Sequence, residues 1–230
     1  MFILGKISMQ GKVFIEQIAR LIIKDIGYTS TDIGFDYLTS HVNINVDYLP
    51  LKALTPSPCY HCGVGYATNE YDDSFLPATQ VFANKICMKL KELRKTKELA
   101  WLRPDCKSQV TMEYKRLPDG MIKPARVFGV VISTQHGPNI SNEVIRKALI
   151  DKAIKEVIPS EYLDARTLYH INPSGTFQTG GPSADSGVTG RKQIVDMYGG
   201  WAPHAGKSMK RRAFIREDAG FCRKGPIVLY

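Results

Sequence analysis

The run from Ile171 to Gly206 constrains the chain most, because glycine recurs throughout it. Glycine at this density lets the backbone pass where a side chain would block it, either in tight turns or against a ligand. Backbone N–H groups freed in this way can bind phosphate oxygens, and the adjacent cations Arg191 and Lys192 would assist. The same composition also fits a turn-rich surface loop without a ligand. Both interpretations stay open, and within the run only Gln193–Met197 reads as ordinary strand or core.

Two common nucleotide-binding motifs are excluded in this run. Gly206, Lys207 and Ser208 end like a P-loop, but that motif needs a glycine five residues before Gly206, where Trp201 stands. The pattern G-x-G-x-x-G of dinucleotide-binding folds is also missing. Any phosphate site in this run must therefore be of another kind.

Composition indicates a soluble protein of one large or two small domains. The chain has 230 residues, and its hydrophobic content of 43% is ordinary for globular proteins. No apolar run approaches the ~20 residues of a membrane helix, and the start MFILGKISM lacks the form of a signal peptide. Five cysteines, an odd number, fit a reducing compartment, and the lone pair Cys59 and Cys62 lacks the second pair of a structural zinc site. We expect a cytoplasmic protein.

The net charge of +9 raises the question of nucleic-acid binding. Cations are spread along the chain, with one concentration at residues 207–224, and no nucleic-acid-binding motif accompanies them. A basic cleft for a polyphosphate explains part of this charge equally well.

Hydrophobic periodicity predicts an α+β architecture in which each sheet is covered on one face. Gly11–Ile26 reads as a helix with Gly27 as its C-cap, and its apolar face comprises Phe14, Ile18, Leu21 and Ile22. A second helix follows Pro77, with Asp73 or Ser74 as its N-cap. The other predicted elements are strands at 2–8, 41–48, 107–115 and 122–134, a loop at 101–105, a turn at 118–120, and a helix at 142–158 capped by Ser141.

Several motifs occur in a fixed order along the chain. NPSG-x-F, GGP-x-x-D-x-G-x-TGRK and D-x-YGGW-x-x-H follow one another, after GYATNE at 65–70, WLRPD-x-KSQVT at 101–111 and ISTQH at 132–136. This succession resembles S-adenosylmethionine synthase (methionine adenosyltransferase). The resemblance implies the sheet-plus-helix layers of that fold, with a complete central domain at 57–172, an incomplete N-terminal domain at 1–49, and the start of a C-terminal domain at 173–230.

The resemblance also implies a reaction: the thioether sulfur of L-methionine attacks C5′ of ATP, and the departing triphosphate is hydrolysed to phosphate and diphosphate. Mg²⁺ and K⁺ are the expected cofactors, and ATP, L-methionine and further subunits are the expected partners. By resemblance, the residues that would neutralise the triphosphate are Lys107, Arg191, Lys192, Lys207 and Lys210. The wider ATP-binding set adds Asp105, Ser174, Gly175, Phe177 and Asp185, and the methionine-binding set comprises Asp185 and Lys210.

The chain departs from the family's pattern at several of its site positions. Lys6 stands where the family has a glutamate for the methionine amino group, Cys59 where it has an aspartate, and Thr176 where it usually has an arginine. The family's His-Pro-Asp-Lys segment and its metal-binding aspartates have no counterpart. We therefore expect a truncated, degenerate member with weak or lost activity and no metal ligands of its own. The alternatives are a non-catalytic partner of a complete synthase, a basic nucleic-acid-binding protein using residues 207–224, and an unstable fragment.

Overall fold

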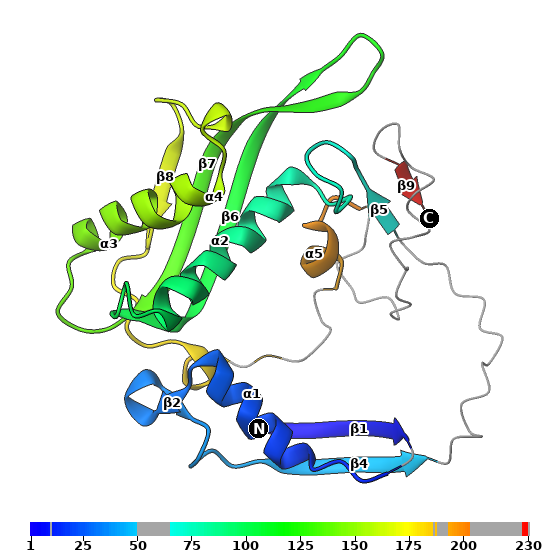
Figure 1. Ribbon diagram of the computed structural model, residues 1–230, viewed down its shortest axis with the longest axis vertical. Helices are drawn as coiled ribbons and strands as arrows, with labels where there is room; N and C mark the ends of the chain where they lie inside the picture. Colours follow the sequence, from blue (N-terminus) through cyan, green and yellow to red (C-terminus); the bar gives the residue numbers. More distant parts are fainter. Residues whose placement is uncertain (10, 50–64, 186, 188–192, 203–226, 230) are drawn as a thin grey trace. The chain divides into compact units, whose positions relative to one another are not determined.

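The described residues form two compact units. The computed structural model describes residues 1–9, 11–49, 65–185, 187, 193–202 and 227–229. Unit 1 comprises Met1–Tyr60 and Thr179–Ser186, and unit 2 comprises His61–Gln178 and Gly187–Tyr230. Both mix helices and strands (Figure 1), so the predicted α+β class is confirmed.

Unit 2 is built on a long β-hairpin. Strands β6 (Leu102–Arg116) and β7 (Ile122–His136) pair antiparallel, and β8 (Leu168–Ile171) adds to β7 in parallel, giving the order β6-β7-β8 (Figure 1). The predicted turn closes the hairpin, where Met121 N–H donates to Asp119 Oδ1 at 3.0 Å. Both predicted strands are confirmed. A separate two-stranded ribbon joins β5 (Gly65–Ala67) and β9 (Ile227–Leu229).

Helices cover one face of this sheet, as the periodicity predicted. α2 (Ala78–Lys95) and the helical segment that follows β7 share one core cluster with the strands. Its fully buried side chains include Phe82 and Ile86 from α2 and Ile132 from β7. On the opposite face, Lys107 and Gln109 of β6 are exposed. Burial of apolar area between sheet and helices is the main source of stability for such a layer.

The N-terminus of α2 is capped from a distance, and the predicted local cap was wrong. Neither Asp73 nor Ser74 caps the helix; Ala78 N–H donates to Glu70 Oε1 at 2.6 Å, and the Tyr114 hydroxyl donates to the same oxygen at 2.9 Å. A carboxylate suits the positive end of a helix. Burial, and then the Glu70 charge, raise the pKa of Tyr114 well above its usual value. A partner eight residues upstream lies outside the usual N-cap pattern.

The helix predicted at 142–158 contains a wider turn in its middle. Ser141 caps it as predicted, accepting from Val144 N–H at 3.4 Å. The segment comprises α3 (Asn142–Leu149), a π-helical turn (Ile150–Ile154) and α4 (Lys155–Val157). The π-turn keeps Ala153 and Ile154 fully buried, so the local change of period maintains contact with the sheet.

The secondary structure differs from the prediction in two further stretches. The stretch 102–105, expected as loop, belongs to β6, because an irregularity in the register between Leu102 and Cys106 lets the strand continue. Residues 193–197, expected as strand or core, lie in the helix α5 (Gln193–Tyr198), and Val195 and Met197 are exposed.

Unit 1 contains a parallel pair of strands joined through a helix. β1 (Phe2–Ser8) pairs with β4 (Asn43–Leu49), α1 (Ile15–Ile26) lies between them in sequence, and a small ribbon of β2 (Thr29–Ser30) and β3 (Phe35–Asp36) follows α1. A helical crossover is what a parallel pair requires. Gly27 ends α1 in the left-handed conformation, as predicted. The predicted apolar face of α1 is exposed in the described residues, at Phe14, Ile18, Leu21 and Ile22.

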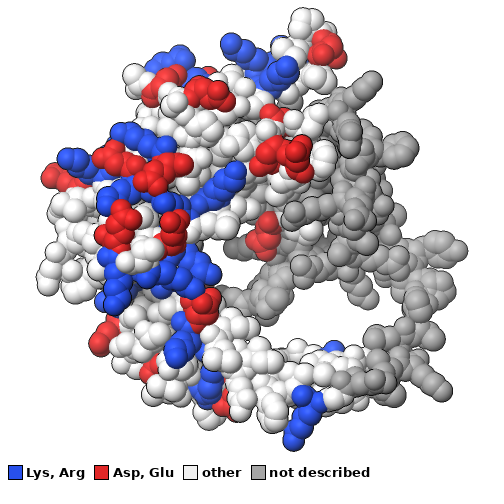
Figure 2. All heavy atoms as spheres, viewed as in Figure 1, with Lys and Arg blue, Asp and Glu red and all other residues white. Residues whose placement is uncertain are grey.

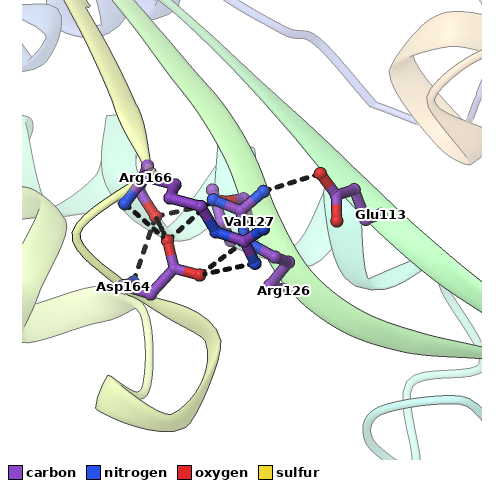
Figure 3. A network of polar contacts seen from close by, with 6 residues as sticks. Glu113, Arg126, Val127, Asp164 and Arg166 are labelled. Carbon is purple, nitrogen blue, oxygen red and sulfur yellow. Dashed lines mark hydrogen bonds and ion pairs between the residues drawn. The ribbon is translucent and has the colours of Figure 1, made fainter.

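A network of polar contacts ties β6, β7 and the segment before β8 together (Figure 3). Arg126 is buried, and its guanidinium donates two hydrogen bonds to Asp164, each at 2.7 Å, and one to Glu113 Oε1 at 2.6 Å. Such a bidentate pair combines charge with fixed geometry. The hydrogen bonds from Arg126 are the largest cause that holds the pKa of Asp164 well below its usual value.

We expect Asp164 to make folding sensitive to acid. A carboxylate with a depressed pKa in the folded state stabilises the protein above its unfolded pKa of about 3.9, and this contribution is lost as the pH falls through the folded pKa. The urea midpoint of wild type should therefore fall as the pH is lowered from about 5 to about 2.5, the range around the unfolded pKa in which the unfolded carboxylate takes up its proton. Asp164→Asn should reduce that pH dependence by up to about one proton. An unchanged dependence would contradict the assignment.

Candidate active site

Asn172 fixes the turn that follows β8 against the end of β7. Thr134 N–H donates to Asn172 Oδ1 at 2.8 Å, and Asn172 Nδ2 donates to Thr134 O at 3.2 Å. The backbone joins as well, since Asn172 N–H donates to Ile132 O at 2.8 Å and Gly175 N–H donates to Asn172 O at 2.9 Å. Asn172 is buried and has a φ of +44°, which asparagine tolerates better than most residues. The NPSG segment is thus held on β7.

His136 extends this attachment to Phe177. Phe177 N–H donates to His136 Nε2 at 3.0 Å, and His136 N–H donates to Phe177 O at 2.9 Å. Because Nε2 accepts, the ring proton is on Nδ1, which donates to Gly137 O at 2.8 Å. Next to it, Gln135 Nε2 donates to Gln178 O at 2.9 Å. The segment 172–178 therefore has a defined path along the end of β7.

The hairpin register brings two further predicted site residues to this end of the sheet. Cys106 lies opposite Thr134 and Lys107 opposite Ser133, so Asp105 and Lys107 are close in the register to the strand end that holds Asn172. Asp105 is half-buried and Lys107 is exposed. No ion pair joins Lys107 to another described residue. This cation is consequently available to an anionic ligand.

Five of the predicted ATP-site residues thus share one end of the unit 2 sheet. These are Asp105, Lys107, Ser174, Gly175 and Phe177. Ser174 is exposed, and Gly175 has a φ of +96° with nothing within 4 Å of the position a Cβ would take. Sequence reasoning did not single out Asn172 and His136, although both belong to recognised motifs, NPSG-x-F and ISTQH. The sequence did not show that these two motifs contact each other in the fold, and that contact is what identifies the two residues.

Asp185 lies in unit 1, at the end of a tight turn. Its N–H donates to Gly181 O at 3.1 Å, and its side chain is exposed. Gly181 has a φ of +70°, and a Cβ there would come within 2.7 Å of two carbons of the Tyr28 ring. This glycine is therefore required by a close approach within the protein. The Gly181–Ser183 turn is a packed element of unit 1.

Replacement of Gly181 by alanine is expected to destabilise unit 1 by about 1–3 kcal/mol, because the side chain would overlap Tyr28 and strain the backbone. Amide hydrogen exchange in α1 should accelerate about tenfold or more. Gly187→Ala is the matched control from the same glycine-rich run, because no atom lies within 4 Å of its Cβ position. Equal exchange rates in the two variants would show that the contact with Tyr28 is unimportant.

The remaining predicted site residues, Arg191, Lys192, Lys207 and Lys210, lie outside the described residues, as does the basic stretch 207–224. Figure 2 shows Lys and Arg interspersed with Asp and Glu over the described part of the visible face.

Comparison with known families identifies the chain. Residues 62–177, more than half of the 230 residues, match the S-adenosylmethionine synthetase central domain. The chain belongs to the S-adenosylmethionine synthetase family. Residues 179–220 match the C-terminal domain of the same synthetase, and this stretch includes the glycine-rich run from Thr179 onward. The central-domain match covers both elements that Asn172 holds together.

The described residues do not supply the metal-ligand set that this synthetase family leads one to expect. Within the described ranges, no three His, Cys, Asp or Glu side chains come together in a way that could hold a metal ion. Among the helices in the described part of the chain, none combines the length and apolar character needed to cross a membrane.

Proposed function

We propose that the end of the unit 2 sheet forms the nucleotide part of an S-adenosylmethionine synthetase site. The observation that carries this proposal is the attachment of residues 172–178 to β7 through Asn172 and His136. That attachment sets Ser174 and Phe177 beside the strand end where Asp105 and Lys107 lie. A cation, a carboxylate, a tight glycine-containing turn and an aromatic ring are suited to a nucleoside triphosphate.

In this proposal each group has a defined task. Lys107 neutralises charge on the triphosphate, Asp105 accepts hydrogen bonds from the nucleotide, and the Phe177 ring lies against the adenine. Arg191, Lys192, Lys207 and Lys210 add positive charge at the triphosphate, and Asp185 and Lys210 contact methionine. Mg²⁺ and K⁺ are the family's cofactors, and they would supply further positive charge at the triphosphate. Catalysis in such a site rests on positioning and on stabilising the leaving charge.

We propose further that methionine adenosyl transfer by this chain is weak or lost. Lys6 stands at the family's glutamate position, and a cation there repels the ammonium group of methionine. Thr176 replaces a family cation, and the loss of one well-placed charge contact costs ~10²–10³ in rate. Methionine-dependent release of phosphate from ATP at a rate typical of enzymes, about 1 s⁻¹ or more, would overturn this part of the proposal.

The deciding measurement is calorimetric titration of folded protein with MgATP, with and without methionine. We expect MgATP to bind to wild type. Lys107→Ala should weaken binding about tenfold to a hundredfold, because a charge-assisted contact is lost. Lys115→Ala is the matched control, since Lys115 is also exposed on β6 but lies toward the opposite end of the strand. Equal losses in both variants would indicate a general effect of charge, and unchanged binding in Lys107→Ala would contradict the site.

A non-catalytic partner subunit is the second candidate function, and the exposed apolar side chains of unit 1 favour it. Phe2, Leu4, Leu21 and Ile22 are each more than half exposed, and such groups commonly lie at protein interfaces. In this form the chain pairs with a complete synthase and modulates it. Co-elution with a full-length synthase in size-exclusion chromatography, with ATP bound but without turnover, would support it. A monomer with full activity would rule it out.

A further inference from the structure

Two cysteines meet where α2 packs on β6. Cys87 lies in α2 one residue after the fully buried Ile86, and Cys106 lies in β6 opposite Thr134. The two thiols are close enough that each shifts the pKa of the other. Both cysteines are free and partly exposed, so a small oxidant can reach them.

Ser108 fixes the position of Cys87 above β6. Ser108 Oγ donates to Ala83 O of α2 at 2.6 Å, and Cys87 Sγ lies 3.1 Å from Ser108 Oγ. Cys106 and Ser108 are two residues apart in the strand, so their side chains point to the same face of the sheet. The sulfur of Cys87 is thereby held over the side of β6 from which Cys106 projects.

The hydrogen bonding also divides the two thiols into different roles. The sulfur of Cys87 has both Cys106 and Ser108 as polar neighbours. The hydrogen bond from Cys106 lowers the pKa of Cys87 to about 6, against the opposing effect of burial. The same hydrogen bond, together with burial, raises the pKa of Cys106. Cys87 is therefore the thiolate nucleophile and Cys106 the thiol that follows.

We propose that Cys87 and Cys106 form a redox-active dithiol that peroxide converts to an intramolecular disulfide. The Cys87 thiolate attacks one oxygen of hydrogen peroxide, the O–O bond breaks, and a sulfenic acid forms as hydroxide takes up a proton to leave as water. The Cys106 sulfur then attacks the sulfenic sulfur, the S–O bond breaks, and a second water leaves. Overall, two thiols and one hydrogen peroxide give one disulfide and two waters. This chemistry does not depend on nucleotide binding.

The test is peptide mapping of the full chain after brief exposure to hydrogen peroxide. After alkylation of remaining thiols, trypsin should release residues 86–89 and 98–107 as one linked species, lighter by two hydrogen atoms than the two peptides together. Dithiothreitol should separate them. In Cys106→Ser the link should be lost, and dimedone should trap a sulfenic acid at Cys87. In Cys87→Ser, Cys106 should stay a free thiol.

A background variant in which serine replaces Cys59, Cys62 and Cys222 should keep the linked species, because those cysteines take no part in it. Two freely alkylated thiols at positions 87 and 106 after oxidation would overturn the proposal. So would pairing of Cys87 with any other cysteine. Both outcomes can be read in wild-type protein, so they do not depend on the stability of a variant.

Discussion

Replacement of Asn172 by alanine is expected to destabilise unit 2 by about 2–4 kcal/mol and to abolish detectable ATP binding. The variant loses two side-chain hydrogen bonds and leaves Thr134 N–H unsatisfied in the interior, which alone costs about 1–3 kcal/mol. Alanine also tolerates the φ of +44° less well than asparagine, at a cost of about 1 kcal/mol. Urea unfolding followed by tryptophan fluorescence measures the first effect, and calorimetry on protein shown to be folded measures the second.

The variant Asn172→Gly separates the loss of the side-chain hydrogen bonds from the backbone strain. Glycine accepts the positive φ without strain but has no amide, so its cost should be smaller than that of alanine by about 1 kcal/mol. ATP binding should be lost in both variants, because both release the NPSG turn from β7. If either variant binds ATP as wild type does while folded, the attachment stabilises the domain without shaping a nucleotide site.

The central layer could be predicted from the sequence because its signals are local. Alternating residues indicated β6, Asp119 and Gly120 indicated the turn after which β7 completes a hairpin, and Ser141 indicated the start of α3. The cap of α2 was missed because Glu70 lies eight residues before the backbone N–H that it accepts from, and because it also accepts a hydrogen bond from Tyr114. The start of β6 was missed because its irregular register depends on pairing with β7, which no local pattern shows.

The candidate site, too, could be predicted from the sequence only in part. Motif order alone indicated Lys107 and the NPSG segment, since both belong to stretches with a recognisable sequence. The hydrogen bonds that hold the NPSG segment at this end of the sheet join Thr134 to Asn172, which are far apart in sequence. They could not be predicted without knowing that β7 and β8 pair in parallel. The role of Gly181 was likewise hidden, because its neighbour Tyr28 belongs to the other chain segment of unit 1 and is far away in sequence. The frequency of glycine indicated that the backbone comes close to another group, but it did not indicate which group.

Phe82→Ala is expected to lower the unfolding free energy of unit 2 by about 3–5 kcal/mol, because a large buried ring is replaced by a cavity. Phe82 is fully buried, and its ring lies edge-on to Tyr71 at 4.7 Å and tilted against Tyr162 at 5.8 Å. Both tryptophans of the chain, Trp101 and Trp201, lie in unit 2. Tryptophan fluorescence in urea therefore reports this unit directly.

Phe14→Ala in unit 1 is the matched control, because the same side chain is removed from a position that is 57% exposed. We expect it to leave the tryptophan transition within about 0.5 kcal/mol of wild type. A large shift with Phe14→Ala would mean that unit 1 unfolds together with unit 2 and that the apolar face of α1 is covered in solution. A small shift with Phe82→Ala would mean that the central layer does not depend on its own core, which its burial argues against.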